Sequence, residues 1–74
     1  MRLTDLEVGE TYVARRDFRD DRDVLVLAGD RFTLHRITPD RGTFAVAFAE
    51  ETLHLDEERQ FEIVEHVDRF LALV

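Results

Sequence analysis

Four aspartates within a short charged segment are the first side chains in this sequence that could do chemistry. These carboxylates are Asp17, Asp20, Asp21 and Asp23. Carboxylate oxygens are the ligands that Ca²⁺ prefers, but the central glycine and closing glutamate of an EF-hand loop are missing. Two arginines, Arg19 and Arg22, lie among the acids and would repel a divalent ion. We interpret residues 17–23, here named the acidic loop, as an exposed segment whose charges partly pair with one another.

The histidines offer a second set of candidate metal ligands. Glu62 and His66 are spaced i,i+4, and His54 lies a short distance before them. These three side chains could bind zinc if the chain reversed direction between His54 and Glu62. Without that reversal, His66 is a boundary residue of an amphipathic helix, with its ring nitrogen in water. Metal or small-ligand binding by the histidines or by the acidic loop is therefore an alternative function.

Catalysis has little support in the sequence. The chain contains no serine and no cysteine, and no threonine has a neighbouring base and orienting group. Its three glycines stand far apart at expected turns, so a glycine-rich phosphate loop is absent. We expect a protein that is not an enzyme and that uses no cofactor.

Alternating apolar residues predict the elements that position these side chains. We expect about five short strands between residues 10 and 55, with the clearest one at 43–49, where Phe44, Val46 and Phe48 share a face. In the strand that starts at Arg31, Ile37 breaks the alternation, which indicates a twist, a bulge or the strand end. The connections are too short for helical crossovers, so neighbouring strands should pair antiparallel.

From Asp56 the apolar period changes from 2 to 3.6, which predicts one C-terminal amphipathic helix over residues 56–73. Asp56 is a favourable N-cap, and Glu65 with Arg69 forms an i,i+4 pair on the polar side. The apolar stripe consists of Ile63, Val64, Val67, Phe70, Leu71 and Val74. The fold class is therefore mostly β (α+β): one antiparallel curved sheet or small barrel closed by a helix, in a single domain over 1–74.

Several apolar side chains exceed what this plan needs. Phe61 and Leu73 lie outside the stripe of the predicted helix, and Tyr12 and Phe18 add to the surplus. The surplus could simply complete a core that wraps around a small barrel. Alternatively, it could form a surface patch that binds a protein partner or a second copy of the chain.

Charge and composition narrow the classes of partner. The net charge is −7 at pH 7, from 17 acidic and 10 basic residues, which disfavours nucleic acid and anionic membranes. The chain contains no cysteine, so disulfides and thiolate zinc sites are excluded. The first residues lack the apolar stretch of a secretory signal, and no apolar run is long enough to span a bilayer. We expect a cytoplasmic protein.

Four segments of the chain, residues 6–13, 18–20, 28–34 and 55–63, read LEVGETYV, FRD, AGDRFTL and LDEERQFEI. Their order resembles DUF3601, a small family of bacterial domains of unknown function. The middle of the chain departs from the family, since residues 38–42 form a shorter connection. The resemblance implies an SH3-like β-barrel with a terminal helix, and it carries no activity or catalytic residue.

The sequence thus favours a non-catalytic protein-interaction module or a small domain that forms homo-oligomers. An acidic surface would attract a basic protein partner by electrostatic steering. The predicted contact residues belong to the acidic loop and to the flank of the predicted helix, and are Asp17, Asp20, Asp21, Asp23, Phe61 and Leu73.

Overall fold

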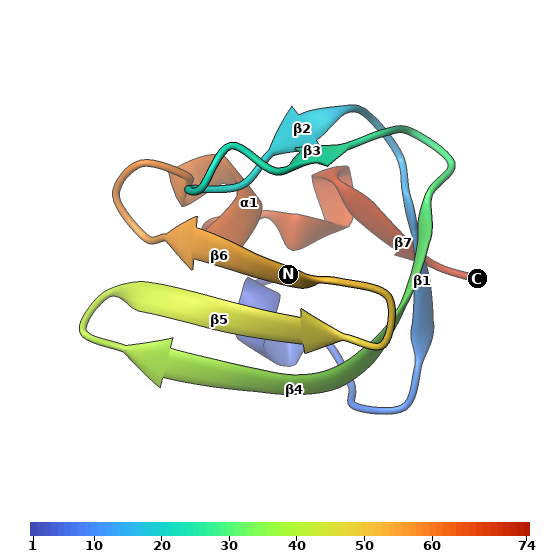
Figure 1. Ribbon diagram of the computed structural model, residues 1–74, viewed down its shortest axis with the longest axis horizontal. Coiled ribbons are helices and arrows are strands. Elements are labelled where there is room, and N and C mark those ends of the chain that lie inside the picture. Colours follow the sequence, from blue (N-terminus) through green and yellow to red (C-terminus); the bar gives the residue numbers. More distant parts are fainter.

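The computed structural model describes all residues from Met1 to Val74 and contains seven strands, one short α-helix and two 3₁₀ turns (Figure 1). In chain order, the elements are η1 (Leu3–Asp5), β1 (Thr11–Ala14), β2 (Phe18–Arg19), β3 (Leu25–Val26), β4 (Arg31–Asp40), β5 (Thr43–Phe48), β6 (Thr52–Asp56), α1 (Phe61–Glu65), η2 (Val67–Arg69) and β7 (Leu71–Leu73). The prediction of a mostly β chain with antiparallel strands is confirmed.

Five strands form one antiparallel sheet in the order β6-β5-β4-β1-β7, and β2 pairs with β3 in a separate hairpin. The long strand β4 connects the two halves of the sheet, because its first residues pair with β1 and the rest pair with β5. The register shifts between Leu34 and Arg36. This irregularity confirms the predicted break in alternation before Ile37, and β4 curves strongly in Figure 1. The sheet does not close, since β6 and β7 are its two edges.

The β4–β5 hairpin has a two-residue turn formed by Arg41 and Gly42. Both residues have positive φ, 51° and 84°, and Asp40 pairs with Thr43 on either side of them. This is the geometry of a type I′ turn, whose twist matches that of the flanking strands. Glycine adopts it without strain, whereas an arginine side chain crowds the following carbonyl.

The C-terminal helix predicted over 56–73 is wrong. The chain instead makes a turn after β6, the single helical turn α1, the 3₁₀ turn η2 and the strand β7. The Asp56 carboxylate does accept hydrogen bonds from the amides of Glu58 and Arg59, as an N-cap would, but regular helix begins only at Phe61. Arg69 pairs with Glu62 at 3.2 Å and not with Glu65. An amphipathic helix gains most of its stability from packing, and here β1 offers a free edge that the last residues pair with instead.

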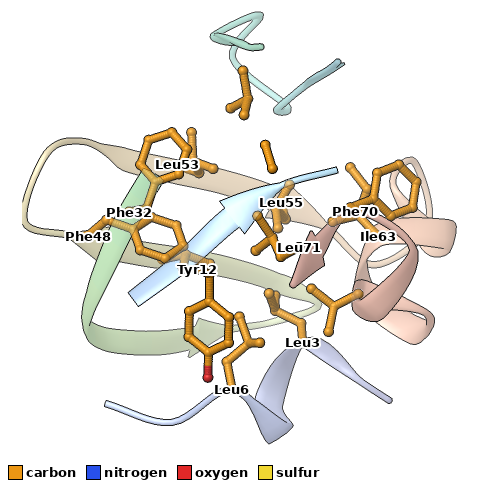
Figure 2. Close-up of a cluster of buried hydrophobic side chains, with 14 of the residues drawn as sticks. Leu3, Leu6, Tyr12, Phe32, Phe48, Leu53, Leu55, Ile63, Phe70 and Leu71 are labelled. Carbon is orange, nitrogen blue, oxygen red and sulfur yellow. The ribbon is translucent and has the colours of Figure 1, made fainter. Parts of the chain in front are cut away.

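One cluster of buried side chains fills the space between the curved sheet and the C-terminal turns (Figure 2). Phe44, Val46 and Phe48 point into it from β5, as their alternation predicts, while Ala45 and Ala47 on the other face are half-buried. Tyr12 and Phe18, which the sequence placed in the apolar surplus, belong to this core. None of the helices is both long enough and apolar enough to cross a membrane.

Candidate functional site

Asp20 is not part of an exposed acidic loop, because only 4% of its surface is accessible. Its Oδ1 accepts hydrogen bonds from the backbone amides of Arg22 and Val24, at 2.9 and 2.8 Å, and its Oδ2 accepts one from the amide of His54, at 2.9 Å. The interpretation of Asp20 as an exposed residue of the acidic loop is therefore wrong, and we do not include it in the candidate binding surface. A buried carboxylate is stable where such hydrogen bonds replace the lost water, so Asp20 holds the structure together.

The Asp20 contacts also cover the β6 edge of the sheet. The amide of Asp21 donates to the carbonyl of His54 at 2.7 Å, so both backbone groups of His54 are bound by the loop between β2 and β3. An exposed strand edge is a template for pairing with another chain. At the middle of β6 the backbone groups that could pair with another chain are already bound by the acidic loop.

The remaining aspartates of the acidic loop point to different partners. The carboxylate of Asp17 accepts from the amide of Ala28, and Asp21 and Asp23 pair with Arg59 and Arg19 at 3.1 and 3.4 Å. No group of three or more His, Asp or Glu side chains is close enough to hold a metal ion, including the set of His54, Glu62 and His66. The expectation that these charges partly pair with one another is confirmed for Arg19 and Asp23.

Phe61 and Leu73 are both exposed, with 53% and 61% of their surface accessible. They do not flank one helix, since Phe61 begins α1 and Leu73 ends β7. The Phe61 ring contacts His66 edge-on, with centroids 6.4 Å apart. Leu73 lies directly opposite Tyr12 of β1 and thus on the same face of the sheet.

The strand that carries Leu73 forms the open edge of the five-stranded sheet. β7 pairs with β1 on one side and has no strand on the other. The predicted helix covered this strand, because Phe70, Leu71 and Val74 fit the helical stripe although Leu73 lies outside it. The available signal was the short apolar run Leu71-Ala72-Leu73-Val74 at the end of the chain.

A groove of about 320 Å³ runs beside β7, between this strand and the N-terminal segment. Its lining residues are Met1, Asp5, Glu7, Glu10, Tyr12, Arg15, Asp68, Leu71, Ala72 and Leu73. All three residues of β7 line it, although successive side chains of a strand point to opposite faces. The groove therefore borders the backbone edge of β7 and not only the side chains on one face of the strand.

The N-terminal wall of the groove is anchored to β1 through Tyr12. The hydroxyl of Tyr12 accepts a hydrogen bond from the amide of Glu7 at 2.8 Å. In Figure 2 the Tyr12 ring extends from β1 toward Leu6, and its oxygen lies at the edge of the core beside that residue. This contact holds the turn that carries Glu7 and Glu10 against the sheet.

The charge of the groove is negative. Its carboxylates belong to Asp5, Glu7, Glu10 and Asp68, against the Met1 amine and Arg15. Asp68 pairs with the Met1 amine at 3.3 Å, and Arg15 donates to the Asp68 carbonyl at 2.7 Å. A hydrogen bond from its own backbone amide, followed by the terminal amine, lowers the pKa of Asp68.

The other three acids of the groove, Asp5, Glu7 and Glu10, form no ion pair with any cation of the chain. The two cations that line the groove, the Met1 amine and Arg15, both contact Asp68. The groove thus has unbalanced negative charge beside an unpaired strand edge. We name β7 together with this groove the β7 surface.

Comparison with known proteins supports the fold alone. No family model matches the chain, and no curated protein matches it. Among solved structures, an integron cassette protein from the mobile metagenome of Vibrio cholerae has a similar fold, with a TM-score of 0.89 and 22% identity over 96% of this chain and 88% of that chain. Nearly the whole chain therefore follows an architecture that also occurs in that protein.

Proposed function

We propose that this chain is a non-catalytic protein-binding module and that the β7 surface is its binding site. The observation that supports this proposal most is the strand edge of β7, which no other strand of the chain pairs with. Exposed Leu73 lies at the end of that edge and adds apolar contact area. The β6 edge is less suitable, since the Asp20 loop already binds the backbone of His54.

The side chains of the groove are better suited to binding than to acid–base catalysis. A carboxyl group that works as a general acid at neutral pH needs a raised pKa, and the pKa of Asp68 is lowered. The groove contains no serine, cysteine or histidine that could act as a nucleophile or base. Its lining combines apolar residues with charged ones, as protein-binding surfaces do.

A basic protein is the partner that the charges favour. The chain carries a net charge of −7, and three carboxylates of the groove have no ion-pair partner. Complementary charge would steer a basic partner toward the β7 surface and make its association dependent on salt.

We also propose that this fold is related to SH3-like barrels and to the DUF3601 domains. The strong bend of β4 and the five antiparallel strands support a relation to SH3-like barrels and to the DUF3601 domains that the sequence resembles. A cytoplasmic place of action is likewise proposed, and it fits a chain without cysteine.

Two matched variants test the proposal. Leu73→Lys adds a positive charge at the acidic β7 surface, where it would repel a basic partner, whereas Phe61→Lys adds the same charge at a similarly exposed apolar site on α1. Each immobilised variant is used to capture partners from a cytosolic extract of the native host, and the molar mass of each purified chain is measured. We expect a partner that wild type and Phe61→Lys retain and that Leu73→Lys loses. Retention by Leu73→Lys, or a monomer that captures nothing, would contradict the proposal.

A further inference from the structure

We propose that the occupant of the β7 surface is an extended basic segment of another protein, which adds to the sheet as a strand beside β7. This inference rests on the proposed function and specifies the mode of binding and the chemistry of the partner.

The backbone hydrogen bonds show which groups of β7 are free. The amide of Val74 donates to the carbonyl of Thr11, and the amide of Arg15 donates to the carbonyl of Phe70. Between these two bonds, Ala72 lies opposite Val13. In an antiparallel pair, alternate residues bond to the neighbour and the residues between them point away. The amides and carbonyls of Leu71 and Leu73 therefore point to the open edge.

An extended segment can satisfy these groups. A strand laid beside β7 would exchange hydrogen bonds with Leu71 and Leu73, which is the mode of recognition known as β-augmentation. At the other end of the sheet, the loop after β2 already does the same for β6, since Asp20 and Asp21 bind the amide and carbonyl of His54. Of the two edges, only β7 lacks such a cover.

The groove determines which side chains the added strand should carry. Alternate side chains of that strand would face the groove, where Leu71, Leu73 and the acids of the N-terminal wall lie. Asp5, Glu7 and Glu10 have no cation of their own chain to pair with. Lysine or arginine at alternate positions would complement them, with an aliphatic stem over Leu73 and the charge at the carboxylates.

A second copy of the chain fits this site less well. Pairing of β7 with β7 about a two-fold axis would bring the two acidic grooves together, each on a chain with a net charge of −7. Like charges placed opposite each other destabilise a strand pair. The observations therefore favour a basic segment over a homodimer.

The test uses a short blocked peptide in which lysine alternates with threonine, and measures its Kd for the full chain by calorimetry. A second peptide has the same sequence with N-methyl groups on the amides of one edge, which removes the backbone donors and keeps the charge. A third replaces each lysine by glutamate. We expect the N-methyl peptide to bind about tenfold more weakly or worse, because two backbone hydrogen bonds are lost, and the glutamate peptide not to bind.

The outcomes separate this inference from the proposed function. Equal Kd values for the plain and N-methyl peptides would mean that charge alone attracts the peptide, and would overturn strand addition. A dimer whose formation Leu73→Lys abolishes would also overturn it, in favour of self-pairing. If no lysine peptide binds while Leu73→Lys still loses a captured protein, the β7 surface binds a folded partner, and only the inference fails.

A variant of the groove tests its charge. The triple change Asp5→Asn, Glu7→Gln and Glu10→Gln should weaken the lysine peptide and flatten the salt dependence of its Kd. The matched control changes Asp17→Asn, Asp23→Asn and Glu51→Gln, which removes the same charge from exposed sites that do not line the groove. Equal losses in both variants would show that only the net charge matters and would overturn the assignment to the groove.

Discussion

The carboxylate of Asp20 accepts a hydrogen bond from the backbone amide of His54 at 2.9 Å, although the two residues are 34 positions apart in the chain. The same carboxylate binds two amides of its own loop, so one buried side chain joins the β2–β3 hairpin to the edge of the main sheet. This contact makes the two sheet edges different: β6 is covered by its own chain, and β7 is open.

Asp20→Asn should destabilise the fold by about 2–4 kcal/mol, because an amide group offers fewer acceptor sites and leaves a buried backbone donor unpaired. Asp23→Asn is the matched control, since its side chain is 84% exposed and its φ of 66° suits asparagine. We expect the control to stay within about 0.5 kcal/mol of wild type. Urea unfolding of the three chains measures both values, and similar stability of the two variants would refute the structural role of Asp20.

Arg41→Asn should stabilise the chain by about 0.5–1 kcal/mol. Arg41 occupies the first turn position of the β4–β5 hairpin at a φ of 51°, and asparagine adopts this left-handed conformation at lower cost than arginine does. Arg41→Ala removes the same charge without this benefit, so it should not stabilise. Thermal unfolding of both variants is the measurement. If Arg41→Ala raised the stability as much as Arg41→Asn, the loss of the positive charge, and not the backbone conformation at residue 41, would explain the gain.

The pH dependence of stability should reflect Asp56. Hydrogen bonds from the amides of Arg59 and then Glu58 hold the pKa of this carboxyl below its usual value of 3.8. Because the pKa is lower in the folded chain, ionised Asp56 stabilises the fold above the usual value, and this stabilisation is lost as the pH falls through the lowered pKa. Asp68 shifts in the same direction and contributes to the same loss.

The comparison of wild type with Asp56→Asn isolates this effect, since asparagine keeps an acceptor but does not titrate. The wild type should be more stable than the variant near neutral pH, and the difference should shrink as the pH falls through the usual value of 3.8 and then through the lowered pKa of Asp56. Melting temperatures across this range provide the measurement. A difference that stays constant with pH would show that ionised Asp56 has no role.

Much of the sheet could be predicted from the sequence, because alternation is a local signal. The strand expected at 43–49 is found as Thr43–Phe48, and the one starting at Arg31 extends to Asp40. No local signal could show that the helix predicted over 56–73 does not form. Pairing of β7 with β1 joins residues at opposite ends of the chain, and the periodicity of 56–73 contains no information about that free edge.

The candidate site was predicted only in part. The sequence left open whether Leu73 completes the core or belongs to a surface patch. The residue is exposed, and its place on a strand edge depends on a long-range contact. Asp20 was assigned to the exposed loop because its neighbours are all charged. Its burial depends on the distant amide of His54, which no local pattern identifies.

Amide hydrogen exchange at β7 tests the central claim most directly. In the free chain, the Leu71 and Leu73 amides should exchange rapidly, whereas the Ala72 amide, which faces β1, should be protected. Addition of the lysine–threonine peptide should then slow exchange at Leu71 and Leu73 and leave Ala72 little changed. Protection of Leu71 and Leu73 already in the free monomer, or no change on saturation with the peptide, would contradict an open edge that binds an added strand.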